Sequence, residues 1–249
     1  RYELVTAHDP DYVDRFLNNE LTEKEVRRIG LRPWTADLVA RTLHLMGGSL
    51  QALEYVLTYG GLAGNMAGGT HHAYRDYGSG YCIFNDLALC ALHALNAPNI
   101  HRILILDLDV HQGDGTAAIF ADTPEIVTCS VHGDKNFPVR KQRSDLDIAL
   151  PDNTQDAEYL DAIDSVLKQL PFDEFDLLLY QAGVDPLKAD RLGRLSLSRD
   201  GLDRRNRRVF EEAAGVGIPV LIFMGGGYAE PITPTIDAFV DLLRGAARG

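Results

Sequence analysis

The sequence predicts an α/β protein with a parallel β-sheet that helices cover on both faces. Four runs of apolar, β-branched-rich residues stand out, and helical patterns separate several of them. Strands that are apolar throughout are typical of a parallel sheet buried on both sides. The runs span residues 102–110, 126–131, 175–181 and 218–224. Because the 249 residues contain no repeat, low-complexity tract or Pro/Ser-rich linker, we expect a single domain over residues 1–249.

The first quarter of the chain is predicted to be helical. Apolar residues recur at three-to-four spacing over residues 38–57, and the pattern stops at Gly60-Gly61. Gly47-Gly48 interrupts this pattern, which indicates either a kink or a close contact with another helix.

A second helix is predicted over residues 199–214 as part of the layer that covers the sheet. Ser198 is a suitable N-cap, and Gly215 is the expected C-terminal stop. The helix contains five arginines, but acidic residues are interspersed among them and no aromatic residues suited to base stacking accompany them. We therefore interpret the arginines as a solvated helix face, not as a nucleic-acid-binding surface.

The composition excludes several classes of protein. With 36 Asp and Glu against 24 Lys and Arg, the net charge is −12, which argues against direct binding of nucleic acid. No apolar run is long enough to cross a membrane. Three cysteines are too few and too irregularly spaced for a disulfide framework or a four-thiolate zinc site. Because no signal-peptide pattern is visible, we expect a cytoplasmic protein. Because the chain begins with Arg1 and not Met, we expect an incomplete N-terminus.

The run at residues 102–110 ends in polar residues. Asp107, Asp109 and His111 are spaced by two, so on a strand they would share one face. Two carboxylates and an imidazole at the end of a buried strand are costly unless a cation compensates them. Since no basic residue follows directly, a divalent metal is the preferred interpretation.

Two later runs also end in functional residue types. Asp185 follows the run at residues 175–181, and Tyr228 follows three glycines after the run at residues 218–224. In open parallel sheets, ligands bind outside the carboxyl ends of the strands, so these residues are expected at one edge.

A glycine-rich loop contains adjacent histidines, His71 and His72. Two imidazoles near a metal suit general acid–base catalysis, because their usual pKa of about 6.5 lies close to working pH. Each needs a partner for its second ring nitrogen, and Asp107 and Asp114 are available carboxylates.

Together these residues predict metal-assisted hydrolysis of an amide or ester. Asp109, His111 and Asp185 provide three zinc ligands and leave a fourth position open. Such a site polarises a carbonyl and activates water, and Tyr228 is placed to donate a hydrogen bond to a developing oxyanion.

The motifs resemble those of the zinc-dependent histone deacetylase family, which has the arginase/deacetylase fold. The matching segments are Gly-Gly-Thr-His71-His72-Ala, Gly-Ser-Gly-Tyr-Cys-Ile-Phe-Asn-Asp, Asp107-Leu-Asp109-Val-His111-Gln-Gly-Asp114-Gly-Thr, Ala-Gly-Val-Asp185-Pro and Gly-Gly-Gly-Tyr228. They occur in the family's order and cover most of the chain. The stretches that begin at Ser144 and Asp190 are most similar to bacterial and class IV members.

The resemblance implies a role for each matching residue. Asp109, His111 and Asp185 would bind zinc (Zn2+), with Fe2+ as an alternative. His72 would act as base and acid, His71 would act electrostatically, and Asp107 and Asp114 would pair with them. Tyr228 would polarise the acyl carbonyl. The substrate-binding residues would be Gly80, Tyr81, Phe137 and Gly226, and a structural potassium ion (K+) would lie at Asp107, Asp109, His111, Ser130 and Val131.

The implied activity is removal of acetyl or longer acyl groups from lysine side chains, so the expected partner is an acyl-lysine protein or a small acyl amine. Gln112 replaces a second histidine found in many eukaryotic members, and Tyr81 replaces the usual tunnel phenylalanine. Three alternatives remain: a deacetylase of acetylpolyamines or other small N-acyl amines, a two-manganese ureohydrolase, and a non-catalytic acyl-binding protein. The acidic excess suggests cationic substrates.

Overall fold

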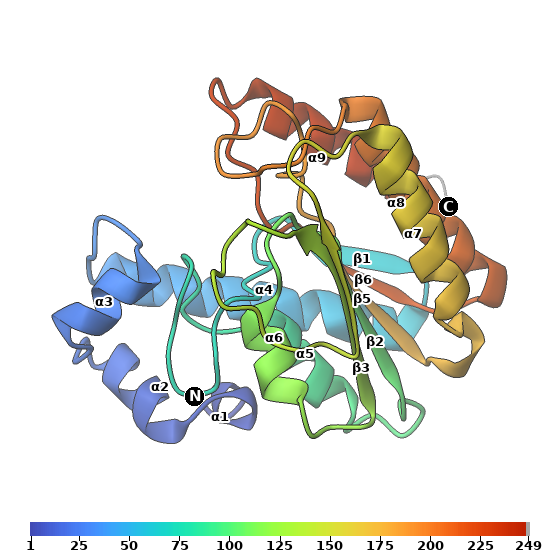
Figure 1. Cartoon of the computed structure of the whole chain (residues 1–249). Coiled ribbons are helices and arrows are strands. Elements are labelled where there is room, and N and C mark those ends of the chain that lie inside the picture. Colours follow the sequence, from blue (N-terminus) through green and yellow to red (C-terminus); the bar gives the residue numbers. More distant parts are fainter. Residues whose placement is uncertain (248–249) are drawn as a thin grey trace.

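The computed structural model describes residues 1–247 and contains a six-stranded parallel sheet between two layers of helices (Figure 1). The strands are β1 (Leu62–Asn65), β2 (Ile103–Asp107), β3 (Ile126–Gly133), β4 (Leu146–Leu150), β5 (Leu177–Gln181) and β6 (Val220–Phe223). Their order in the sheet is β1-β6-β5-β2-β3-β4, and every neighbouring pair is parallel. The predicted fold class is confirmed.

One layer consists of the N-terminal and middle helices, and the other of the C-terminal helices (Figure 1). The first contains α1 (Leu4–Ala7), α2 (Pro10–Leu17), α3 (Glu23–Ile29), α4 (Asp37–Tyr59), α5 (Asp86–Ala94) and α6 (Asp114–Phe120). The second contains α7 (Asp156–Gln169), α8 (Arg199–Val216) and α9 (Thr233–Ala246), with a short 3-10 helix at Phe172–Glu174 before β5. None of the helices within residues 1–247 combines the length and apolarity needed to span a membrane.

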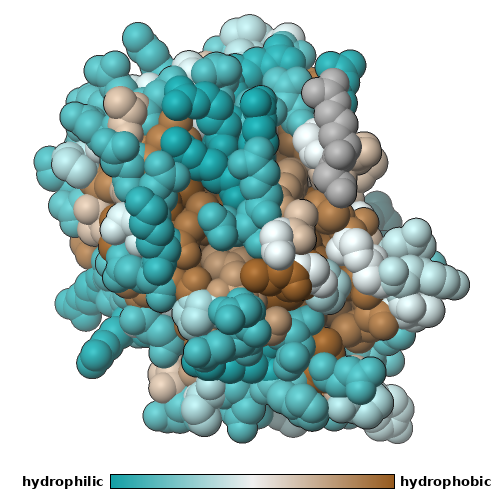
Figure 2. Space-filling view, turned by 90° about the vertical axis from the view of Figure 1, so that its right-hand side faces the viewer, coloured by the Kyte–Doolittle hydropathy of each residue, from teal (hydrophilic) through white to brown (hydrophobic). Residues whose placement is uncertain are grey.

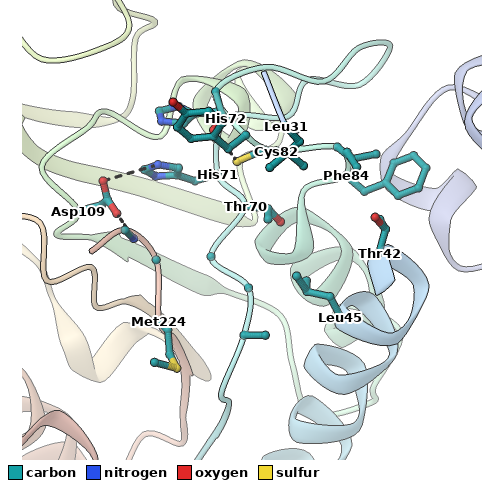
Figure 3. A pocket seen from close by; sticks show the side chains of 18 of the residues that line it. Leu31, Thr42, Leu45, Thr70, His71, His72, Cys82, Phe84, Asp109 and Met224 are labelled. Carbon is teal, nitrogen blue, oxygen red and sulfur yellow. Dashed lines mark hydrogen bonds and ion pairs between the residues drawn. The ribbon is translucent and has the colours of Figure 1, made fainter. Parts of the chain in front are cut away.

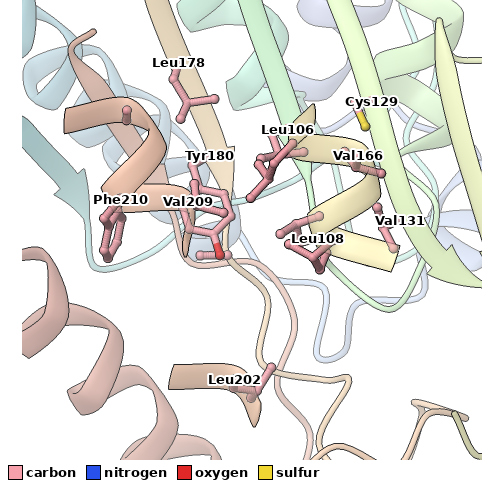
Figure 4. Close-up of a cluster of buried hydrophobic side chains, with 14 of the residues drawn as sticks. Leu106, Leu108, Cys129, Val131, Val166, Leu178, Tyr180, Leu202, Val209 and Phe210 are labelled. Atoms are coloured by element: carbon pink, nitrogen blue, oxygen red, sulfur yellow. The ribbon is translucent and has the colours of Figure 1, made fainter. Parts of the chain in front are cut away.

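The strands are apolar throughout because their alternate residues enter two separate cores. Leu104 and Leu106 of β2 pack with α7 and α8, as the close-up of that core shows (Figure 4). Ile103 and Ile105 point to the opposite face and pack with α4 and α5. The outer surface of the α7–α9 layer is mostly hydrophilic (Figure 2). This two-sided burial explains the runs that predicted the sheet.

The predicted helices exist, but two details were wrong. Ser198 is the N-cap of α8, and its hydroxyl accepts a hydrogen bond from the Gly201 N–H at 3.0 Å. Gly215 does not end this helix, since α8 continues to Val216 and the left-handed cap residue is Gly217 with φ 75°. Glycine adopts this left-handed conformation without strain, which explains why Gly217 is the cap residue.

Gly47-Gly48 lies within an uninterrupted α4. A Cβ at Gly48 would lie 2.7 Å from Nδ2 of Asn65, so the close contact is with the end of β1 and not with another helix.

The strand predictions also need correction. β1 and β4 were not predicted, because β1 is four residues long and contains glycine and asparagine, and β4 carries an aspartate at its second position. The predicted strand at residues 102–110 ends earlier, at Asp107. Asp109 and His111 therefore lie in the loop beyond β2, where period-two alternation does not apply.

Candidate active site

The predicted site residues converge at the carboxyl ends of four neighbouring strands. The loops after β1, β6, β5 and β2 carry His71-His72, Tyr228, Asp185 and Asp109 respectively. Because these strands are adjacent and parallel, their loops emerge at the same edge of the sheet. The side chains meet there although more than 150 positions separate the first from the last.

Asp109, His111 and Asp185 form a compact group of potential metal ligands. Their candidate ligand atoms all lie within 4.8 Å of one another. Nδ1 of His111 is 3.1 Å from Oδ1 of Asp109 and 3.1 Å from Oδ2 of Asp185. All three side chains are buried, and Asp185 is 0% exposed.

Backbone N–H groups hold the two carboxylates in place. The His111 N–H donates to Oδ1 of Asp109 at 3.0 Å, and the Gly226 N–H donates to Oδ2 at 2.7 Å. The Val110 N–H donates to Oδ1 of Asp185 at 2.9 Å. A Cβ at Gly226 would lie 2.0 Å from Oδ2 of Asp185, so this approach requires glycine. Gly226 thus shapes the ligand group.

The electrostatics of this group favour a bound cation. Burial, and then repulsion by Asp109, raise the pKa of Asp185 to about 7. Burial alone would lower the pKa of His111, but hydrogen bonds with Asp109 and Asp185 outweigh it and raise this pKa to about 10. Two buried carboxylates and one imidazole are a donor set that suits a divalent transition metal, and zinc sites of this kind have three protein ligands. The residues therefore fit the metal that the resemblance implies.

The adjacent histidines each contact a separate carboxylate. Nδ1 of His71 is 2.6 Å from Oδ2 of Asp107, and Nδ1 of His72 is 2.5 Å from Oδ1 of Asp114. The His72 contact orients the ring and leaves its Nε2 free of that partner. Both rings line a cavity, and Nε2 of His71 lies 3.8 Å from Oδ1 of Asp109 (Figure 3).

The two histidines differ in their preferred charge. Burial, and then the positive charge of His71, lower the pKa of His72 to about 4. Burial would also lower the pKa of His71, but Asp107 and Asp109 outweigh it and raise this pKa to about 9. At neutral pH, His72 is therefore a neutral base beside a protonated His71. Environments that separate the pKa values of two titratable groups are typical of acid–base catalysis.

Several supporting residues were not predicted. The Asp86 carboxylate accepts hydrogen bonds from the Gly69 N–H at 3.0 Å and the Thr70 N–H at 2.8 Å, which fixes the histidine loop to α5. The Tyr74 hydroxyl donates to Oδ2 of Asp114 at 2.9 Å. Asp86 is the last residue of the matching segment that begins at Gly78, which was a signal of its importance, whereas no local pattern marks Tyr74.

Tyr228 lies at the entrance to the site. Its side chain follows the glycines after β6, and its N–H donates to Oδ2 of Asp190 at 2.6 Å. Burial, and then the negative charges of Asp109 and Asp185, raise the pKa of its hydroxyl above the usual value. The phenol is therefore protonated at neutral pH and its hydroxyl hydrogen is available for donation.

A cavity of about 470 Å³ connects His72, His111 and Tyr228 to the surface. Gly80, Tyr81, Phe137 and Tyr228 line it together with His72 and His111. The Phe137 ring packs edge-on against the His72 ring at 4.8 Å, and a Cβ at Gly80 would lie 2.6 Å from His72. The predicted tunnel residues thus lie around the predicted base. A second cavity of about 420 Å³ extends from the histidines toward α4, past Thr42 and Leu45 (Figure 3).

Arg205 of α8 contradicts the interpretation of its helix as a uniformly solvated arginine face. Its side chain is 0% exposed, and its guanidinium donates to the carbonyl oxygens of Leu108, Gly183 and Ala182 at 3.1, 2.8 and 3.1 Å. These carbonyls belong to the two loops that carry Asp109 and Asp185. The position of Arg205 offered a signal, because it lies on the buried face of α8 between Leu202 and Val209.

Comparison with known proteins places the chain in a family. A family model of the histone deacetylase domain matches residues 1–240. An uncharacterized protein of Picosynechococcus is 48% identical over 230 residues, covering 92% of this chain and 76% of that protein. Histone deacetylase 2 of Arabidopsis thaliana is 33% identical over 238 residues, covering 92% of this chain and 61% of its own length. Acetoin utilization protein AcuC of Bacillus subtilis is 31% identical over 215 residues, covering 78% of this chain and 55% of its own length. The chain belongs to the histone deacetylase family.

Proposed function

We propose that the protein is a zinc-dependent amidohydrolase that removes acetyl or longer acyl groups from lysine side chains. The observation that carries this proposal is the combination at one cavity of three elements. They are the buried group of Asp109, His111 and Asp185, of which His111 lines the cavity, the neutral His72, and the protonated phenol of Tyr228. These elements supply metal binding, general base catalysis and oxyanion stabilisation.

Asp109, His111 and Asp185 would hold Zn2+, with Fe2+ as an alternative. When bound, the ion would polarise the acyl carbonyl and activate the attacking water. His72 takes a proton from that water at Nε2, because its Nδ1 is committed to Asp114. The same proton then passes from His72 to the amine nitrogen as the C–N bond breaks, so the products are a carboxylic acid and a free amine.

The other residues act on charge and position. His71, paired with Asp107, places a positive charge beside the reacting carbonyl. Tyr228 donates its hydroxyl hydrogen to the oxygen on which negative charge develops. Gly80, Tyr81 and Phe137 form the cavity wall that the acyl-lysine side chain would contact.

The potassium ion remains a prediction from the resemblance. Asp107 and Ser130 are register partners on β2 and β3, so two of the expected ligand residues are neighbours. Both Asp107 oxygens have partners in His71 and the Asp109 N–H, and the Ser130 hydroxyl lies 3.0 Å from Nδ1 of His132. No step of the proposed reaction depends on this ion.

The rival functions are separable by experiment. Within residues 1–247, one group of three or more His, Cys, Asp or Glu side chains converges as a metal site, whereas a two-manganese ureohydrolase needs ligands for two ions. About two manganese ions per chain and guanidine hydrolysis would favour that alternative. Binding of an acyl peptide without product release would favour a non-catalytic acyl-binding protein.

The test is a deacylation panel that varies acyl-chain length and amine carrier, including acetylpolyamines, with zinc or iron supplied. We expect turnover of acyl-lysine peptides and a loss of about 100-fold or more in kcat for His72→Ala and for Tyr228→Phe. Full turnover by either variant would show that the assigned mechanism is wrong. Circular dichroism of each variant would establish that the fold is retained.

A further inference from the structure

The outer part of the 470 Å³ cavity is positively charged. Among the described residues, Arg28, Lys135 and Arg194 line the cavity, and none of its lining residues is Asp or Glu. All three cations are exposed. This local charge is opposite to the net charge of −12 for the whole chain.

Nearby carboxylates neutralise only part of this charge. Lys135 and Arg194 share one carboxylate, because Oδ2 of Asp152 is 3.7 Å from Nζ of Lys135 and 3.2 Å from a guanidinium nitrogen of Arg194. The guanidinium carbon of Arg28 lies 4.5 Å from the centre of the Tyr77 ring, and Arg28 has no ion pair with any residue in the described part of the chain. The lining thus keeps a surplus of positive charge.

Asp190 is the acidic residue of the loop that carries Arg194, and backbone N–H groups occupy its oxygens. Oδ1 accepts hydrogen bonds from the N–H groups of Leu192 and Gly193, both at 2.8 Å, and Oδ2 accepts one from Tyr228. Its carboxylate therefore holds the loop in place and is a poor partner for a cation in the substrate.

We propose that the acyl-lysine substrate lies in an acidic sequence, so that Asp or Glu beside the acylated lysine faces Arg28, Lys135 and Arg194. This inference rests on the proposed function and specifies its substrate class. It also reverses the expectation, based on net charge, that cationic substrates are preferred. Charged groups at the mouth of a site change the rate at which a charged substrate associates and the strength of its weak binding there. Because these groups are exposed, salt screens their effect.

The experiment uses the zinc-loaded protein and three acetyl-lysine peptides that differ only in the flanking residues, which are Asp, Gln or Lys. We expect kcat/KM to fall in the order Asp, Gln, Lys, with a difference of about 10-fold between the extremes at low salt. At about 0.5 M NaCl the difference should fall to about 2-fold. Acetylputrescine tests the competing cationic small-molecule class and should be a poorer substrate than the Asp peptide.

Variants locate the effect at the cavity mouth. Replacing Arg28, Lys135 and Arg194 together by Gln should remove most of the preference while kcat for the Gln peptide stays near the wild-type value. Lys168→Gln is the matched control, because Lys168 is an exposed cation near the end of α7 in the opposite helix layer, and it should preserve the preference.

The outcomes separate the two claims. Turnover in which the Lys peptide or acetylputrescine equals or exceeds the Asp peptide would overturn the charge inference and leave the proposed function standing. An unchanged preference in the triple variant would overturn it as well. Failure to hydrolyse any peptide or acyl amine would overturn the proposed function and this inference with it.

Discussion

Replacing Arg205 tests what holds together the two loops that carry the metal ligands Asp109 and Asp185. Its guanidinium is the buried link between the carbonyls of Leu108 after β2 and of Ala182 and Gly183 after β5. Arg205 also donates to Oδ1 of Asn206 through Nε at 3.0 Å. Arg205→Met keeps much of the side-chain volume and removes every one of these donors.

The structure allows the size of this effect to be estimated. A buried carbonyl that loses its donor costs about 1–3 kcal/mol, and three carbonyls lose donors here. Because Arg205→Met also removes the unfavourable burial of a cation, we take the low end of about 1 kcal/mol for each of the three carbonyls. We expect the free energy of unfolding to fall by about 3 kcal/mol, a large part of the roughly 5–15 kcal/mol of a typical domain. Zinc affinity should fall by about 10- to 100-fold, as when other supports of metal ligands are removed.

The assay is urea unfolding followed by circular dichroism, together with zinc titration against a competing chelator. Arg207→Ala is the matched control, because Arg207 lies on the exposed side of the same helix and pairs with Asp203. It should change stability by less than about 0.5 kcal/mol. If Arg205→Met unfolds with the wild-type free energy and binds zinc equally well, the assigned role of Arg205 is wrong.

Three further predictions use other residues. Gly215→Ala should raise the free energy of unfolding by about 0.5–1 kcal/mol, because Gly215 lies inside α8 with open space around it; destabilisation in urea would contradict this. Gly226→Ala should abolish stoichiometric zinc binding measured by calorimetry, because the new Cβ meets Asp185. Burial lowers the pKa of His8 from its usual 6.5 to about 4, so between these pH values the unfolded chain binds more protons than the folded one. Stability should therefore fall as pH drops from 6.5 to 4, and His8→Gln should flatten that slope; an equal slope would refute the assignment.

Much of the fold is encoded in local patterns. The four apolar runs predicted a parallel sheet because strands buried on both faces need no polar alternation. β1 and β4 were not predicted because they are edge strands. Edge strands are less buried, so polar residues such as Asn65 and Asp147 are tolerated in them and no continuous apolar run marks them. The end of helix α8 could not be fixed from local sequence either. Gly215 resembles a stop signal, but the residue in the left-handed conformation that ends the helix is Gly217.

The candidate site was predictable where the topology decides it. Parallel strands bring their carboxyl ends together, so Asp109, Asp185 and Tyr228 could be assigned to one edge. Their detailed placement could not, because Asp109 lies beyond the strand and is held by the Gly226 N–H from another loop. The role of Arg205 also depends on tertiary contacts, although its place on the apolar face of α8 was visible in the sequence.

In the proposed reaction, amide hydrolysis in this cavity requires a metal held by Asp109, His111 and Asp185. The most direct measurement is release of free acid from an acyl-lysine peptide before chelation, after chelation, and after stepwise return of zinc. Activity should disappear on chelation and return in proportion to zinc, with a maximum at about one ion per chain. Full turnover by the chelated, metal-free protein would show that hydrolysis does not require the metal.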